Sequence, residues 1–199
     1  MDYLLALFVF AFSTTATPGP NNVMIMTSGL NFGIKRSIPH FLGICIGFPF
    51  MVLLVGAGLG GMFEAFPFMH SLVQIVGVVY LLYLAWKIAC SEAAVAGKNA
   101  STPLTFIQSS LFQWVNPKAW MMATGAVAAF STPDGNIWLQ VLLIALAFFI
   151  SAFPAVGIWL FFGVKLRRFL SQPKQRKIFN WVMAGLLVIS ILPVISDWF

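Results

Sequence analysis

The sequence predicts an all-α polytopic membrane protein, on the evidence of its composition, the spacing of its charged residues and two Pro/Gly breaks inside apolar segments. Of its 199 residues, 60% are hydrophobic and only 8% are charged, whereas about a quarter of the residues in soluble domains are charged. We therefore expect a single transmembrane domain that covers residues 1–199.

Six apolar segments lie between the charged residues, and a transmembrane helix needs about 20 such residues. The first has no basic residues before it, which favours a retained span over a signal peptide. The expected spans run from about Tyr3 to Ser28, Ile38 to Phe63, Met69 to Cys90, Thr105 to Phe130, Asn136 to Val164 and Ile178 to Ser196.

The loops predict the orientation of these spans. Ten of the eleven Lys and Arg residues, including Lys35 and Arg36 in the loop expected between the first two spans, lie at or after the ends of the first, third and fifth spans. The acidic residues Asp2, Glu64, Asp134 and Asp197 fall on the other side. Because basic loops stay in the cytoplasm, both termini should lie outside it. The same rule accounts for the net charge of +6, so we expect no nucleic-acid partner.

The two halves of the chain are expected to be inverted repeats. A polar linker at about residues 91–103 separates half 1 (about 1–90) from half 2 (about 104–199), and each half has three spans. An odd number of spans makes the second half enter the membrane in the opposite direction. Proline interrupts the first span of each half, at Pro18 and Pro117, which is typical of transporters that bind substrate at broken helices.

The first break is the run from Thr17 to Asn22. Pro18, Gly19 and Pro20 should interrupt the helix, and such irregular backbone is tolerated at mid-membrane depth only inside protein or beside a wet cavity. A helix that restarts here would offer free amides to a carboxylate, and the carboxamides of Asn21 and Asn22 could bind a zwitterion. We therefore predict substrate binding at Pro18, Gly19, Pro20, Asn21 and Asn22.

Hydroxyl groups precede this break, at Ser13, Thr14, Thr15 and Thr17. They could line a cavity, in particular Thr14 and Thr17, or they could only bond to carbonyls of their own helix. The sequence leaves both interpretations open.

The second break, in the fourth span, carries the other predicted substrate-binding residues: Gln113, Asn116, Pro117 and Lys118. Gln113, Asn116 and Trp120 are spaced to share a helical face. Lys118 is the only basic residue away from the ends of a span, and it could pair with a substrate carboxylate, snorkel, or bond to carbonyls freed by Pro117. Trp114 and Trp120 could wall the cavity or only pack.

Several chemistries find no support in the sequence. No Asp or Glu lies inside an expected span, which disfavours a cationic substrate and points to a net-neutral one. No phosphate-binding glycine loop is present. His40 and His70 fall at opposite faces of the membrane, and Cys45 and Cys90 lack metal-ligand or disulfide spacing. We expect no metal, no cofactor and no enzymatic activity.

Three motifs resemble the lysine exporter (LysE/RhtB) superfamily of amino-acid translocators. They are Thr17-Pro18-Gly19-Pro20-Asn21-Asn22, Ala85-Trp86-Lys87-Ile88 and Phe112-Gln113-Trp114-Val115-Asn116-Pro117-Lys118. The resemblance covers nearly the whole chain and is greatest to the branch that exports cysteine, O-acetylserine and other small neutral amino acids. It implies secondary export across the bacterial inner membrane, driven by the proton gradient.

The leading hypothesis is thus a secondary transporter that exports small net-neutral amino acids, such as cysteine, O-acetylserine, homoserine or threonine, across the inner membrane. The alternative is a passive small-solute channel or a non-transporting membrane scaffold. The expected partners are an amino-acid substrate and the lipid bilayer. A homo-oligomer is compatible with the sequence, which does not specify the oligomeric state.

Overall fold

The computed structural model describes residues 2–59, 65–90, 102–132, 135–170, 172–192 and 195. Within these ranges the chain is helical and contains no strand, in agreement with the predicted all-α class. Most of the expected linker at 91–103 lies outside the described residues, as do Glu64, Asp134 and Asp197. The helices are α1 (Asp2–Ala16), α2 (Pro20–Leu54), the π-helical turn η1 (Val55–Leu59), α4 (Pro67–Ala89), α5 (Phe106–Phe112), the 3₁₀ turn η2 (Gln113–Val115), α6 (Pro117–Phe130), α7 (Ile137–Phe169) and α8 (Pro173–Ile189).

Three of these helices are long and apolar enough to cross a membrane. They span Pro20–Gly58, Ser71–Ala89 and Ile137–Phe169, and a shorter apolar helix covers Tyr3–Ala16. The side chains that these helices turn outward are largely apolar, for example Leu5 and Phe161. Such a surface suits lipid contact, because hydrocarbon does not penalise exposed apolar groups.

The sequence predicted a loop at Lys35 and Arg36, and this prediction was wrong. Both residues are helical, and α2 changes direction at a single residue, Gly33, which has φ 77° and ψ 177°. Only glycine adopts such a positive φ readily, because it lacks a Cβ atom. The chain therefore turns between the expected first and second spans without a longer loop.

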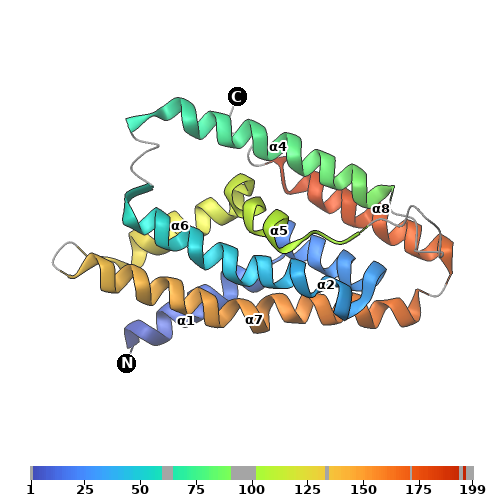
Figure 1. Cartoon of the computed structure of the whole chain (residues 1–199), viewed down its shortest axis with the longest axis horizontal. Coiled ribbons are helices and arrows are strands. Elements are labelled where there is room, and N and C mark those ends of the chain that lie inside the picture. The colour runs from blue at the N-terminus through green and yellow to red at the C-terminus, as the bar shows by residue number, and fades with distance from the viewer. Residues whose placement is uncertain are drawn as a thin grey trace.

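Helix α2 is the element against which most of the others pack. Its most extensive contacts are with α7, which also lies along α1, and α4 and α8 form a pair that lies side by side in Figure 1. Gly29 and Gly163 allow the close approach of α2 and α7: a Cβ atom on Gly163 would collide with the carbonyl of Met26. This packing brings the end of α1 and the start of α2 against the middle of α7.

Candidate functional site

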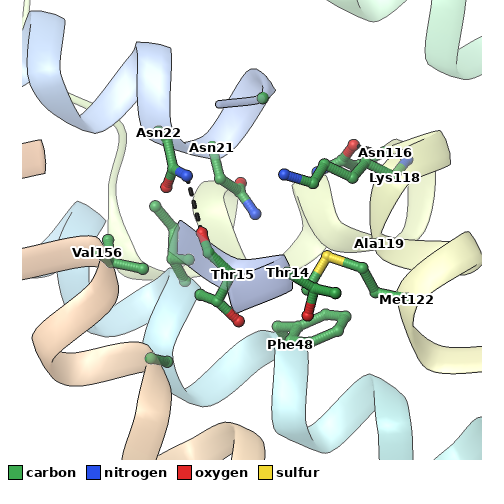
Figure 2. A pocket seen from close by; sticks show the side chains of 13 residues that line it. Thr14, Thr15, Asn21, Asn22, Phe48, Asn116, Lys118, Ala119, Met122 and Val156 are labelled. Carbon is green, nitrogen blue, oxygen red and sulfur yellow. Dashed lines mark hydrogen bonds between the residues drawn. The ribbon is translucent and has the colours of Figure 1, made fainter. Parts of the chain in front are cut away.

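A cavity lies where the two predicted breaks meet. It encloses about 410 Å³ of atom-free space, part of it open to the outside, and residues of α1, α2, α6 and α7 form its wall. Figure 2 shows Thr14, Thr15, Asn21, Asn22 and Lys118 around this space. The lining residues are Thr14, Thr15, Gly19, Asn21, Asn22, Ile44, Phe48, Asn116, Lys118, Ala119, Met122, Ala152 and Val156.

The first interruption separates α1, which ends at Ala16, from α2, which begins at Pro20. The last carbonyls of α1 have no intrahelical partner. The buried Asn22 carboxamide donates to the carbonyls of Thr15 and Thr17, at 2.8 Å each. The indole of Trp159, from α7, donates to the carbonyl of Ala16 at 3.0 Å. Side chains from beyond the break thus satisfy the carbonyls that the break exposes.

The second interruption is centred on Asn116. This residue is extended (φ −91°, ψ 108°) between η2 and Pro117, the first residue of α6, and its side-chain oxygen accepts from the amide of Lys118 at 3.2 Å. Because the helix is not continuous, Gln113, Asn116 and Trp120 do not share a helical face. That prediction was wrong: the spacing argument assumes the unbroken helix that Pro117 prevents.

Lys118 connects the two interruptions. Its ammonium group donates to the carbonyl of Thr17 at 2.6 Å and to that of Pro18 at 3.3 Å. The sequence left three possible partners for Lys118, and the structure shows hydrogen bonds to backbone carbonyls. These carbonyls belong to the first break, whereas the sequence suggested those freed by Pro117. Gly19 makes room for this contact, because a Cβ atom on it would lie 2.8 Å from Cδ of Lys118.

A reciprocal pair of carboxamides forms a second connection. Asn21 donates to Oε1 of Gln113 at 2.9 Å, and Gln113 donates back to Oδ1 of Asn21 at 3.2 Å and to the carbonyl of Ser109 at 2.9 Å. Gln113 is fully buried, so this pairing removes the cost of an unpaired amide in an apolar interior. The start of α2 is thereby fixed against the end of α5.

Most of the hydroxyl groups before the first break bond to their own helix. Thr14 donates to the carbonyl of Phe10 at 2.7 Å, and Thr17 to that of Ser13 at 2.5 Å. The exception is Thr15, whose buried hydroxyl has no hydrogen-bond partner among the described residues. Thr15 also lines the cavity.

The cavity gathers some of the predicted site residues and leaves out others. Those that line it are Thr14, Gly19, Asn21, Asn22, Asn116 and Lys118. The side chains of Trp114 and Trp120 instead pack on each other, with ring centroids 6.0 Å apart. The predicted residues that do not line the cavity are Thr17, Pro18, Pro20, Gln113, Trp114, Pro117 and Trp120.

The apolar part of the wall was not predicted from the sequence. It includes two pairs of residues spaced four apart, Ile44 with Phe48 in α2 and Ala152 with Val156 in α7. Each pair lies close to a proline inside its helix, Pro49 or Pro154. Pro49 and Pro154 each fall in the second expected span of their half, and this match was the signal in the sequence that could have indicated this part of the wall.

The comparison with known proteins identifies the family of this chain. Residues 12–191 match the model of the LysE type translocators. The chain belongs to this family. The predicted resemblance is therefore confirmed, and with its long apolar helices the chain is a multi-pass membrane protein of a translocator family.

Relatives with assigned names span most of the chain. A cysteine/O-acetylserine efflux protein of Klebsiella pneumoniae subsp. pneumoniae is 29% identical over 197 residues, which are 96% of each chain. A protein of the same name from Escherichia coli (strain K12) is 31% identical over 188 residues, 93% of each chain. One from Salmonella choleraesuis is 35% identical over 133 residues, 66% of this chain and 67% of its own. No solved structure matches.

Proposed function

We propose that the chain is a secondary transporter that exports small net-neutral amino acids and binds them in the cavity between the two helix interruptions. The observation that carries this proposal is the position of Lys118, whose ammonium lines the cavity while it is held by two carbonyls. The names of the relatives support cysteine and O-acetylserine as substrates, and homoserine and threonine are of similar size.

The carboxylate of the amino acid would bind between Lys118 and the start of α2. An ammonium has three donors, and the carbonyls of Thr17 and Pro18 use two of them. Gly19, the N-cap of α2, provides no side-chain cap, so the first amides and the positive end of the helix dipole also attract an anion. None of the residues that line the cavity is acidic, so the carboxylate of the substrate would be the counterion.

The rest of the cavity suits a short, uncharged side chain. The unpaired hydroxyl of Thr15 can accept a hydrogen bond from the substrate ammonium. Opposite the polar groups, Phe48, Met122 and Val156 provide an apolar wall. A second fixed charge on the substrate would find no oppositely charged partner among the lining residues, and burying an unpaired charge is costly.

We also propose that the chain has six spans in two inverted three-helix repeats. The spans would be α1 with residues 20–32, residues 34–59, α4, α5 to α6, α7, and α8. Helices in corresponding positions are in contact: the later part of α2 with α7, and α4 with α8. The two interrupted spans also meet, through Lys118 and through Asn21. A pseudo-two-fold axis in the membrane plane would place each such pair together.

We infer the orientation from the basic residues, which favour both termini in the periplasm and three connections between spans in the cytoplasm. In the bacterial inner membrane, this orientation leaves the helix ends that carry Lys35 and Arg36, Lys87, and Arg167 and Arg168 on the cytoplasmic side. Efflux as the direction of transport rests on the names of the relatives.

Counterflow in proteoliposomes tests the function. Vesicles loaded with unlabelled O-acetylserine should transiently accumulate the labelled compound, and excess cysteine, homoserine or threonine should compete, whereas lysine and glutamate should not. A passive channel gives no such overshoot, because it does not couple opposite fluxes. Purified, folded protein that gives no counterflow with any of these amino acids would contradict the proposal.

A further inference from the structure

A second pocket lies between α2, α4 and the segment before α5, and it shares no lining residue with the first. It holds about 460 Å³ of atom-free space, part of it open to the outside. Its lining residues are Met24, Thr27, Ser28, Asn31, Phe32, His40, Leu84, Lys87, Ile88, Thr102, Pro103 and Leu104.

Two buried side chains in this pocket carry polar atoms without a partner. His40 is 1% exposed and Asn31 is 4% exposed. Nδ1 of His40 shares a hydrogen bond with the hydroxyl of Ser28 at 2.9 Å, but Nε2 has no partner among the described residues. Asn31 donates to Asn180 at 3.3 Å, but within the described part of the chain its Oδ1 accepts no hydrogen bond. Most buried polar atoms in proteins are paired, so these two indicate a polar ligand.

The mouth of the pocket carries a positive charge. Lys87, in the last turn of α4, is exposed and lines the pocket. The pocket thus combines a cation at its mouth with a buried acceptor, Asn31 Oδ1, and a buried imidazole nitrogen. A zwitterion has the matching groups, because its carboxylate can pair with the ammonium of Lys87 and its own ammonium can donate to Oδ1 of Asn31. In the tautomer whose Nδ1–H donates to Ser28, Nε2 of His40 accepts from the same ammonium.

The first part of α2, residues 20–32, lies between the two pockets. Asn21 and Asn22, at its start, line the first pocket, and Ser28 and Asn31 line the second. Nine residues of helix separate Asn22 from Asn31, or about 13 Å. The same short helix therefore exposes polar side chains to both pockets.

We propose that the second pocket is an additional solute site, which binds a zwitterionic amino acid through Lys87, Asn31 and His40 on the side of the basic loops. This inference rests on the proposed function, since the ligand is the transported amino acid. The second pocket would hold the solute on the cytoplasmic side before it reaches the first pocket along residues 20–32.

Protection of an introduced cysteine tests the second site. In a Cys90→Ser parent, which retains only the buried Cys45, a Thr102→Cys variant places a thiol at the second pocket and a Met122→Cys variant places one at the first. O-acetylserine, compared with mannitol at equal osmolarity, should slow maleimide labelling of both thiols at least threefold. Protection at Thr102→Cys should persist when Lys118→Gln is added, and protection at Met122→Cys should not.

Substitutions in the second pocket provide the complementary result. Lys87→Gln, at an exposed position, and the nearly isosteric Asn31→Leu should each abolish protection at Thr102→Cys, whereas Lys165→Gln, the exposed control, should leave it unchanged. Protection at Met122→Cys alone would overturn the second site and leave the proposed function intact. Protection at neither thiol, together with absent counterflow, would overturn both.

Discussion

Replacement of Gly19 by alanine is the most informative single change, because it acts on Lys118 without altering the lysine itself. Gly19 is extended, with φ −178°, a conformation that alanine adopts without strain. The added Cβ atom would lie 2.8 Å from Cδ and 3.1 Å from Nζ of Lys118. The lysine side chain must therefore move away from the carbonyls of Thr17 and Pro18.

The magnitude follows from the hydrogen bond that is lost. A hydrogen bond to a charged group contributes about 1.5–3 kcal/mol, and each 1.4 kcal/mol corresponds to about a tenfold change. If the position of the ammonium determines carboxylate binding, Gly19→Ala should lower kcat/KM for O-acetylserine counterflow about 10- to 150-fold. The control is Gly125→Ala in α6, where an added Cβ atom meets nothing within 4 Å.

A double-mutant cycle shows whether the effect runs through Lys118. On a Lys118→Gln background, Gly19→Ala should cause little further loss, because the contact that it disturbs is already absent. Wild-type transport by Gly19→Ala would refute the reasoning. So would a loss of the same size on both backgrounds, since the alanine would then act elsewhere.

Three further predictions concern packing and topology. Asn21→Leu and Gln113→Leu should each lower the melting temperature in detergent, because each variant leaves the other carboxamide without its reciprocal hydrogen bonds. The double variant should lose less than the sum of the two, and strict additivity would contradict the reciprocal pair. Gly163→Ala should sharply reduce the yield of folded protein, because the added Cβ atom would collide with the backbone of Met26. Gly185→Ala, whose Cβ atom would have open space around it, should not reduce the yield. Equal yields from the two variants would contradict the close α2–α7 contact. The exposed Cys90 should react with a membrane-impermeant maleimide in inverted vesicles but not in intact cells. The buried Cys45 should react in neither preparation. Labelling of Cys90 in intact cells would contradict the proposed orientation.

The sequence predicted the class of fold and the positions of the helix ends around the cavity because these depend on local chemistry. Composition indicates membrane helices, and Pro18, Pro20 and Pro117 lack the amide that a continuous helix needs. Helices do end and begin beside these prolines. The same local reasoning was wrong at Lys35 and Arg36. It predicted a loop there, but the chain turns at the single residue Gly33 and both charged residues are helical.

The partners across the cavity could not be predicted, because they depend on tertiary packing. Lys118 bonds to carbonyls about 100 positions earlier in the chain, and Trp159 bonds to the end of α1. Nothing in the sequence around Trp159 distinguishes it from a packing residue. The pairing of Asn21 with Gln113 likewise required the two halves to be placed together.

The central claim, that Lys118 binds the carboxylate of a transported amino acid between the two interruptions, is tested most directly by counterflow of labelled O-acetylserine in proteoliposomes that contain Lys118→Gln. We expect this variant, and Asn21→Ala, to reconstitute in normal amounts and to lose most of the counterflow, whereas the exposed Lys165→Gln should transport like the wild type. Wild-type counterflow by folded Lys118→Gln would contradict the account.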